Sequence, residues 1–263
     1  MKVCALLERG TPPRLNPIFA EVFRRLADRG VGVTLCYPEE ELIRLDTLAV
    51  DADLYLLKSD TELALSFATA LEQLGARVLN PARACAVVKD KIQVAAALAA
   101  ARIPAPATWM AASLGALTPT PAGAARLAKP VRGYHGVGVA LLQPGAAPPA
   151  ETRAPEPAFA QAYLADARLD LKIYGIGDEL FGVRKAFARD SYREAGEPAP
   201  LSATVRELAH RVAATFELTL FGLDLAETDH GVQVIDVNYF PGYRGVPGAV
   251  ERLEAAILRA LPA

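Results

Sequence analysis

Two carboxylates and an amide occupy matching positions on two strands that the sequence predicts between residues 221 and 239. If the tight turn between these strands centres on His230, Asp224 lies directly opposite Asp236 in an antiparallel pair. Asn238 follows two residues later and therefore shares the face of Asp236. Like charges opposite each other destabilise a ladder, and a hard cation such as Mg²⁺ held between oxygen ligands removes that penalty. The spacing predicts a magnesium site on this face.

The other face of the predicted hairpin is apolar and is expected to pack on a core. Its members alternate with the polar positions along both strands: Phe221, Leu223, Leu225, Ile235, Val237 and Tyr239. The simpler alternative is a half-exposed hairpin carrying two solvated acids, and spacing alone leaves both interpretations open.

A lysine followed by three glycines forms a second group that could do chemistry. Lys129 ends a predicted strand, and Gly133, Gly136 and Gly138 follow it. Glycines let backbone N–H groups approach phosphate oxygens closely, and a lysine adds a point charge. The run matches neither the P-loop pattern nor G-x-G-x-x-G after a strand. It predicts either a phosphate-binding loop of another kind or an ordinary glycine-rich turn.

Other charged residues are less informative on their own. Lys89, Asp90 and Lys91 form a cluster on a predicted alanine-rich helix, where a solvated face is the simplest interpretation. Lys172 and Arg184 lie in neighbouring strands of a predicted hairpin, and outward-facing surface charges are the simplest interpretation there. The order of residues along the chain gives no Ser–His–Asp or Cys–His arrangement for nucleophilic catalysis.

Length and composition limit the classes of protein. With 263 residues the chain is long enough for two or three subdomains around a sizeable core. A formal net charge of −2 argues against bulk binding to nucleic acid. The 3 cysteines lack metal-binding spacing and favour a reduced, cytoplasmic setting. The first seven residues are too short for a signal peptide, and no apolar run has the length of a membrane span.

Alternation of strands and helices predicts how the chain is organised. Strands are expected at Lys2–Leu7, Val31–Cys36, Asp53–Leu57, Ala76–Leu79, Arg126–Val131, Val137–Leu142, Phe159–Tyr163, Leu169–Tyr174 and Leu180–Lys185, before the hairpin. Helices are expected after an Asn16 cap, at Thr61–Leu74, from Pro81 to Arg102, after a Ser202 cap and from about Pro247. The stretch Ser191–Ala199 is expected to be a loop. Three domains follow from this pattern: 1–82, 83–165 and 166–263.

Taken in order, these motifs resemble the ATP-grasp superfamily across nearly the whole chain. The resemblance runs through Asn80-Pro81, Asp90-Lys91, Ile103-Pro-Ala-Pro, Lys129-Pro130 with its glycine loop, Gln161-Ala-Tyr-Leu164, Asp170–Asp178 and Asp224 with Asp236-Val-Asn238. It implies a mixed α/β and α+β fold with an N-terminal βαβ-type domain, a small central lid lobe and a C-terminal α+β lobe.

The resemblance also implies that ATP and Mg²⁺, or Mn²⁺ in its place, bind between two lobes. Lys91, Lys129 and Lys172 would contact ATP, the segment from Gln161 through Tyr163 to Leu164 would surround adenine, and Asp224, Asp236 and Asn238 would hold the metal. The loop with Gly133, Gly136 and Gly138 would close over the nucleotide. An acceptor oxygen would then receive the γ-phosphate.

One branch that the chain resembles is the inositol phosphate kinases. The carriers of this likeness are Asp236-Val-Asn-Tyr-Phe-Pro-Gly-Tyr-Arg-Gly and Tyr55-Leu-Leu-Lys58. By this resemblance Lys172, Arg184 and His135 take catalytic roles. Lys58, Arg14, Gly242 and Arg244 contact the acceptor, a small anionic or polyol molecule. These cations suffice for one or two phosphates, or for one carboxylate.

The other branch is the carboxylate–amine ligases, similar to the glutamate ligases that modify ribosomal protein. Val137-Gly-Val139 and Gly177-Asp178 are closer to this branch, while the Arg-Ser-Asn stretch of those ligases is missing after Arg184. A third hypothesis, a nucleotide-binding protein without catalysis, is opposed by the intact acidic set. We therefore expect an ATP-dependent kinase, or alternatively a ligase, acting on a small molecule as a monomer or homodimer without nucleic-acid or membrane partners.

Overall fold

The N-terminal sheet is built from short strands, and all but the edge strand at residues 32–36 are apolar and buried on both faces. The computed structural model describes residues 1–9, 15–117, 124–133, 138–145, 157–167, 170–185 and 196–262. In its first part β1 (Lys2–Leu6), β2 (Gly32–Cys36), β3 (Leu54–Leu57) and β4 (Val78–Leu79) pair in parallel in the order β2-β1-β3-β4. A parallel sheet of this kind needs helices on its faces.

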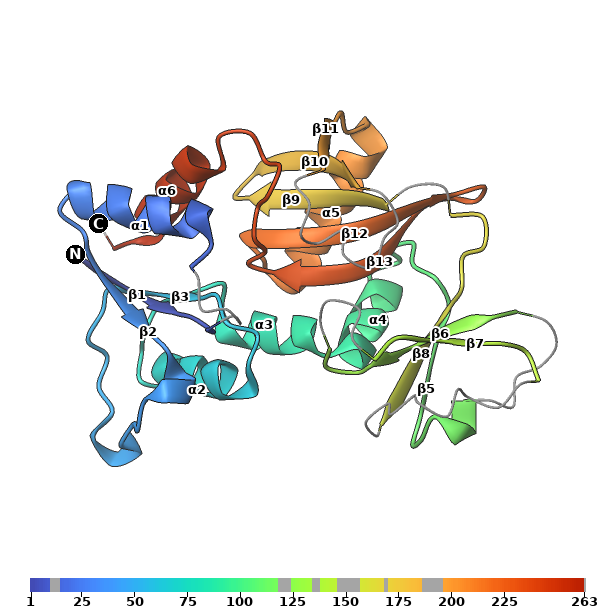
Figure 1. The fold of residues 1–263 in the computed structure, drawn as a ribbon, viewed down its shortest axis with the longest axis horizontal. Coiled ribbons are helices and arrows are strands. Elements are labelled where there is room, and N and C mark those ends of the chain that lie inside the picture. Colours follow the sequence, from blue (N-terminus) through green and yellow to red (C-terminus); the bar gives the residue numbers. More distant parts are fainter. Residues whose placement is uncertain are drawn as a thin grey trace.

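Those helices begin close to the residues at which the sequence predicts their starts. The Asn16 side chain accepts from the Ile18 N–H at the start of α1 (Pro17–Asp28), and Thr61 caps α2 (Glu62–Gln73). Two short 3₁₀ helices, η1 (Pro38–Glu40) and η2 (Leu45–Thr47), follow β2. The C-terminal helix α6 (Ala249–Ala260) packs beside α1, far from it in sequence, so both chain ends lie at the same side of the molecule (Figure 1).

The expected single helix from Pro81 to Arg102 is wrong, because the chain breaks at Asp90. The structure has α3 (Ala82–Lys89) and α4 (Lys91–Ala100), with Asp90 extended between them. The Asp90 carboxylate accepts from the N–H groups of Ile92 and Gln93 and so starts a new helix. This break places Lys91 at the first position of α4.

A small antiparallel sheet forms a separate lobe at the right of Figure 1. Its strands are β5 (Thr108–Ala111), β6 (Arg126–Pro130), β7 (Ala140–Leu142) and β8 (Ala158–Ala162), in the order β5-β8-β6-β7, with a 3₁₀ turn η3 at Gly115–Leu117. One face packs a small apolar cluster of its own: Leu117, Ala128, Leu142, Ala158 and Ala160. The other face is turned to the rest of the molecule and carries Lys129 and Gln161.

The third sheet contains the predicted hairpin. β9 (Asp170–Ile176), β10 (Glu179–Lys185), β11 (Glu197–Ala199), β12 (Leu220–Thr228) and β13 (Gly231–Tyr239) pair antiparallel in the order β11-β10-β9-β12-β13. Ser202 caps α5 (Ala203–Phe216), as predicted. The expected loop Ser191–Ala199 is wrong at its end, because residues 197–199 gain backbone partners on the edge of β10.

These three sheets and their helices confirm the expected mixed α/β and α+β fold. One continuous hydrophobic core joins the N-terminal sheet to the five-stranded sheet, whereas the four-stranded sheet has its own small core. The domain boundaries at 1–82, 83–165 and 166–263 stay a proposal. Within the described ranges, no helix is long and apolar enough to cross a membrane.

Candidate functional site

The acidic pair of the hairpin lies in register as predicted, although the turn does not. Asp224 is paired with Asp236 across β12 and β13. Thr228 pairs with Gly231, so the turn is centred before His230, half a residue away from the predicted centre. A β-bulge next to the acidic pair adds one residue to β13 and restores the pairing.

The bulge corrects the prediction for Ile235, which was expected on the core face. Leu225 pairs with Val234, and Val234 is the fully buried residue at this point. Ile235 is the extra residue of the bulge and lines a cavity instead. The remaining predicted core positions of the hairpin, Phe221, Leu223, Leu225, Val237 and Tyr239, are all buried.

Each acid of the pair is held by a lysine from another element. Lys172 on β9 is directly beside Asp224, with 2.7 Å between Nζ and Oδ1. Lys91 at the start of α4 lies 3.2 Å from Asp236 Oδ1. Both lysine side chains are only 15% exposed, so these are not the solvated surface charges of the simplest interpretation. The two ammonium groups offset the repulsion between the carboxylates.

The donor set on this face fits a hard cation. Asp224, Asp236 and Asn238 offer carboxylate and amide oxygens, and Asn238 pairs with Gly222 next to the acidic pair. Mg²⁺ commonly takes one or two carboxylates and completes its shell with water and phosphate oxygens. The described residues contain no cluster of three or more His, Cys, Asp or Glu side chains. Asp224, Asp236 and Asn238 therefore suit an Mg²⁺ ion whose other ligands are water and phosphate oxygens.

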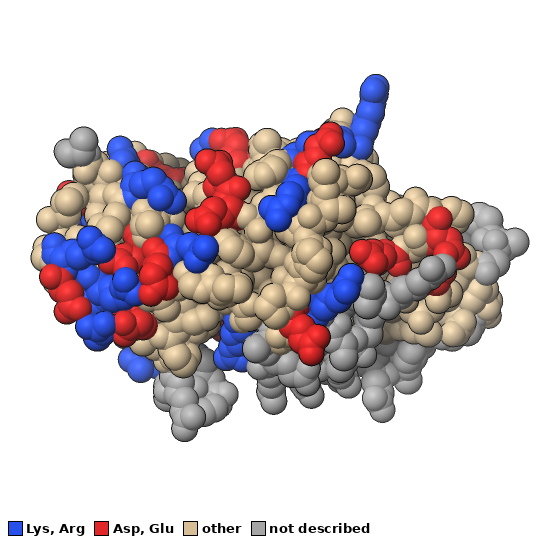
Figure 2. Space-filling view, turned by 90° about the horizontal axis from the view of Figure 1, so that it is seen from above, with Lys and Arg blue, Asp and Glu red and all other residues tan. Residues whose placement is uncertain are grey.

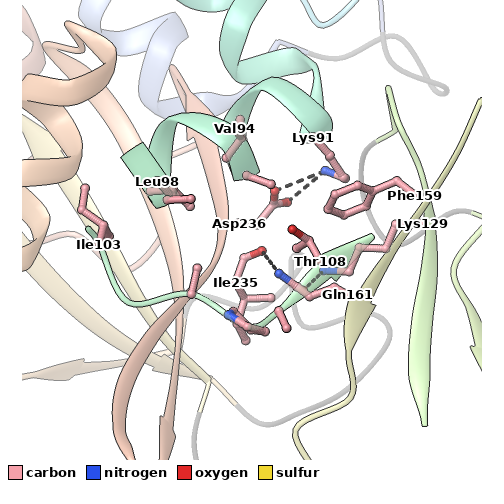
Figure 3. A pocket seen from close by; sticks show the side chains of 15 residues that line it. Lys91, Val94, Leu98, Ile103, Thr108, Lys129, Phe159, Gln161, Ile235 and Asp236 are labelled. Atoms are coloured by element: carbon pink, nitrogen blue, oxygen red, sulfur yellow. Dashed lines mark hydrogen bonds and ion pairs between the residues drawn. The ribbon is translucent and has the colours of Figure 1, made fainter. Parts of the chain in front are cut away.

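A cavity of about 260 Å³ opens beside the acidic pair. Most of its wall is apolar, and one end is charged (Figure 3). The lining residues come from α4, the 103–108 segment, β6, β8 and β13: Lys91, Val94, Ala95, Leu98, Ala99, Ile103, Ala105, Pro106, Ala107, Thr108, Lys129, Phe159, Gln161, Ile235 and Asp236. A flat apolar ring with an anionic extension matches this shape and polarity.

The charged end of the cavity brings together Lys91, Lys129, Gln161 and Asp236, all expected from the sequence (Figure 3). Lys129 Nζ donates to Gln161 Oε1 at 2.7 Å. Burial lowers the pKa of Lys129, while the nearby charge of Asp236 acts in the opposite direction. A partly dehydrated ammonium group beside an apolar wall is a strong site for a phosphate oxygen.

Other residues expected to surround a nucleotide lie outside this cavity or outside the described residues. Tyr163 and Leu164 follow β8 and do not line the cavity, and Tyr163 is 47% exposed. Gly138 has a positive φ of 76°, and a Cβ atom there would lie 2.8 Å from Pro130 Cγ, so the position requires glycine. Gly133 packs on the same proline. Gly136 and His135 are outside the described residues.

Arg184 and Lys172, both expected in catalytic roles, lie in neighbouring strands but are not paired with each other. Val183 is the partner of Lys172 across β9 and β10, and Arg184 pairs with Leu171. Neighbouring residues of a strand point to opposite faces. Arg184 therefore lies on the other face of the sheet from Lys172, and its catalytic role stays a prediction.

The expected acceptor residues gather around the loop that follows β13. Asn16 Nδ2 donates to the Gly242 carbonyl at 3.1 Å, and Phe19 packs edge-on against Phe240. Lys58 extends from the end of β3 with its Nζ 5.7 Å from the centre of the Phe19 ring. Arg244 is an exposed residue of the same loop, and Arg14 lies outside the described residues.

Several residues of these sites were missed by the sequence analysis. The apolar walls formed by Val94, Leu98, Phe159 and Ile235 have no signal that separates them from core residues. Phe19 was expected only as part of the apolar stripe of its helix. The Asn16-Pro17 pair did mark a helix start, but only the fold shows that Asn16 also holds Gly242.

Comparisons with known proteins agree with this geometry. Residues 161–258 match the family model described as the inositol 1,3,4-trisphosphate 5/6-kinase ATP-grasp domain. The chain is 29% identical over 190 residues to the ribosomal protein bS6–L-glutamate ligase of Shigella flexneri, covering 66% of this chain and 63% of that protein. It thus spans less than two thirds of this relative's length. It is 28% identical over 229 residues to a probable α-L-glutamate ligase of Xanthomonas euvesicatoria, covering 76% of each.

The fold is shared with a RimK-domain ATP-grasp protein from Sphaerobacter thermophilus, at a TM-score of 0.78 and 19% identity, covering 98% of this chain and 100% of that one. The relatives are named as ligases, in agreement with the expectation of an enzyme. In motif order, in fold and in the relatives named above, this chain is similar to the ATP-grasp superfamily.

Proposed function

We propose that this protein is an ATP- and Mg²⁺-dependent ligase that joins a carboxylate to an amine. The observation that carries the proposal is an apolar cavity whose charged end is continuous with a pair of carboxylates, together with relatives named as glutamate ligases. Adenine fits the apolar part, formed by α4, β8 and the 103–108 segment. Lys91, Lys129 and Lys172 contact the phosphates, and Asp224, Asp236 and Asn238 hold the metal.

The chemistry begins at the γ-phosphorus. A carboxylate oxygen of the acceptor attacks it in line, the bond to the β,γ-bridging oxygen breaks, and ADP leaves. The amine then attacks the acyl carbon, phosphate leaves, and the amine loses a proton as the amide forms. A bound Mg²⁺ neutralises charge on the phosphate oxygens. Lys91, Lys129 and Lys172 stabilise the same negative charge from fixed positions around it.

The charge of the acceptor side supports a single carboxylate in place of a polyphosphate. Arg9 near the end of β1 is already paired with Glu40. Lys58 is half-buried, and no acidic side chain of the described residues forms an ion pair with it. Among the described residues, the ammonium group of Lys58 matches one carboxylate, while a highly phosphorylated acceptor needs several cations.

Phosphoryl transfer to a hydroxyl group is the second candidate. The family model that matches residues 161–258 describes a kinase domain, and this range contains the hairpin and the loop after it. Both reactions share the first step at the same metal site. They differ only in the acceptor atom and in whether phosphate is released.

The test is to incubate the protein with ATP, Mg²⁺ and a panel of amino acids, short acidic peptides, amines, polyols and inositol phosphates, and to follow phosphorus by NMR. ADP and inorganic phosphate that form only when an acid and an amine are both present support the ligase. A new phosphomonoester signal together with ADP contradicts it and supports the kinase.

Lys58→Ala tests the acceptor side. We expect nucleotide affinity to stay unchanged and acceptor KM to rise about tenfold or more, because a charge-assisted hydrogen bond is lost. Lys2→Ala is the control, since Lys2 is paired with Asp51 at the opposite end of the sheet. A collapse of ATP affinity in Lys58→Ala contradicts the placement of Lys58 on the acceptor side.

A further inference from the structure

Arg132 connects the start of the glycine loop to two acids on other elements. It directly precedes Gly133, the first glycine of that loop. Its Nη1 lies 3.1 Å from Glu62 Oε2, and its Nη2 lies 3.8 Å from Asp90 Oδ2. Glu62 is the first residue of α2, and Asp90 is the N-cap of α4. A single guanidinium group therefore joins three parts of the chain.

One of these acids directly follows the loop that carries an expected acceptor residue. Residues 58–61 come between β3 and α2, include Lys58 and are named the acceptor loop. Lys89 Nζ donates to the Asp60 carbonyl within this loop and lies 3.7 Å from Glu62 Oε1. Each oxygen of the Glu62 carboxylate thus faces one cation, an ammonium group on one side and the guanidinium group on the other. A shift of the guanidinium group is therefore transmitted to the acceptor loop.

The residue before Arg132 is tied to the proposed phosphate site. The Val131 carbonyl accepts from the Lys91 N–H at 3.0 Å. Lys91 and Lys129 both line the charged end of the cavity, and Lys129 lies two residues before Val131. Residues 131 and 132 therefore connect the phosphate site with the acceptor loop.

Exposure limits what this contact contributes to folding. The side chains of Arg132 and Glu62 are 51% and 55% exposed, and exposed ion pairs contribute little to folding stability. Group transfer is far more sensitive to position, because a misplacement of about 1 Å between reacting atoms can cost about 100-fold in rate. A contact that matters little for folding can thus matter for the placement of the acceptor loop.

We propose that Arg132 is a positioning residue that couples nucleotide binding to the conformation of the acceptor loop through its ion pair with Glu62. A nucleotide held by Lys91 and Lys129 fixes residues 131 and 132, and the Glu62 carboxylate passes this restraint to residues 58–61. The acceptor loop is therefore more ordered when the nucleotide is bound. This inference rests on the proposed nucleotide site.

The experiment measures hydrogen–deuterium exchange of the backbone amides in residues 58–65, with and without a non-hydrolysable ATP analogue and Mg²⁺. In the wild type we expect the bound analogue to slow this exchange about fivefold or more, as is usual for coupled sites. In Arg132→Gln the slowing should disappear, because the ion pair to Glu62 is lost. The affinity for the analogue, measured by calorimetry, should stay within about threefold, since the lysines that contact phosphate are unchanged.

Three further variants separate coupling from a general loss of charge. Arg132→Lys keeps the positive charge and should retain most of the slowing. Glu62→Gln should lose the slowing as Arg132→Gln does, and the double variant should lose no more than either alone. Arg24→Gln is the matched control and should behave as the wild type, because Arg24 is 59% exposed and pairs with Glu21 and Asp28 within its own helix.

The outcomes separate a failure of this inference from a failure of the proposed function. Unchanged slowing in Arg132→Gln, or a loss of slowing in Arg24→Gln as well, overturns the inference alone. A wild type that binds the analogue with no change in exchange at residues 58–65 does the same. If Arg132→Gln does not fold, Glu62→Gln decides the matter. A wild type that does not bind the analogue overturns the proposed function and the inference with it.

Discussion

At the scale of single residues, the site combines a repulsive pair of acids with lysines that come from elsewhere in the chain. Asp224 and Asp236 face each other across the hairpin, and Lys172 and Lys91 each hold one of them. Lys129 adds a third ammonium group nearby. Lys91, Lys129 and Asp236 line one end of the cavity, and Lys172 and Asp224 lie next to them. Charges of both signs in one place favour a polyanion that binds together with divalent cations.

Asp236→Asn tests the metal assignment. The loss of one charged ligand should cost at least about 3 kcal/mol of transition-state stabilisation, or roughly a 100-fold fall in kcat/KM. The value of kcat/KM is measured by steady-state kinetics of ADP release. Glu227→Gln removes an acid from the same hairpin, outside the cavity, and should retain activity. Near-normal turnover of Asp236→Asn would refute the metal site.

Lys129 should make nucleotide binding sensitive to alkaline pH. Burial lowers its pKa, the charge of Lys91 adds to this effect, and Asp236 and Asp224 oppose it. The charged form binds phosphate, so ADP affinity is full at low pH and falls as pH rises through this lowered pKa. Calorimetric titrations with ADP between about pH 7 and about pH 10 measure this affinity. The affinity should fall at a pH below the usual lysine pKa of about 10.4.

Lys129→Arg is the informative variant for this pH dependence, since a guanidinium group stays charged throughout that range. The fall in ADP affinity should disappear in it. The same fall in Lys129→Arg as in the wild type would assign the titration to a different group.

At the scale of elements, two local irregularities build the site. The bulge at Ile235 keeps Asp236 opposite Asp224 and turns Ile235 into the cavity. The break at Asp90 ends α3 and begins α4, so that Lys91 stands at the first turn of a new helix. Its backbone N–H donates to the Val131 carbonyl, which fixes α4 against the end of β6.

Asp90→Ala should destabilise the protein by about 1 kcal/mol, because the N-cap of α4 loses its side-chain acceptor. For a chain of this size the melting temperature should fall by about 2–4 °C. Asp90→Asn keeps the acceptor oxygen and should recover most of the loss. Thermal denaturation of the three proteins measures this, and equal melting temperatures would show that the cap does not hold the break.

At the scale of the whole molecule, the C-terminal helix closes the chain onto its own beginning. Figure 2 shows basic and acidic side chains intermingled at the end of the molecule where α1 and α6 lie. Glu254 on α6 forms ion pairs with Arg25 on α1 and with Arg29, the residue directly after α1, and the Glu254 side chain is only 4% exposed. The pairing holds α6, which follows the 240–246 loop, against the N-terminal domain.

Glu254→Ala should lower the free energy of unfolding by about 2–3 kcal/mol, because two arginines lose a buried partner. Glu251→Ala is a close control: Glu251 also pairs with Arg25 but is 58% exposed, and its loss should cost under about 1 kcal/mol. Denaturant titrations compare the two variants. Equal losses of unfolding free energy in the two variants would mean that burial does not decide how strongly these ion pairs stabilise the protein.

Much of the fold follows from local patterns in the sequence. Asn16, Thr61 and Ser202 mark helix starts because their side chains cap free N–H groups within the same turn. Alternation along 221–239 predicts a hairpin with two acids face to face, and these acids are in register. Such features depend on residues only a few positions apart.

The amino-acid sequence by itself determined which chemistry is present: opposed carboxylates, lysines, a glycine loop and helices with defined starts. Only the tertiary structure decided which lysine meets which acid, that Arg184 lies on the opposite face from Lys172, and that Ile235 leaves the core for the cavity. The physical reason is that strand pairing, a one-residue bulge and cavity walls depend on segments up to 145 residues apart. Local periodicity assigns a residue to a face, but its partner across space is chosen by packing of the whole chain.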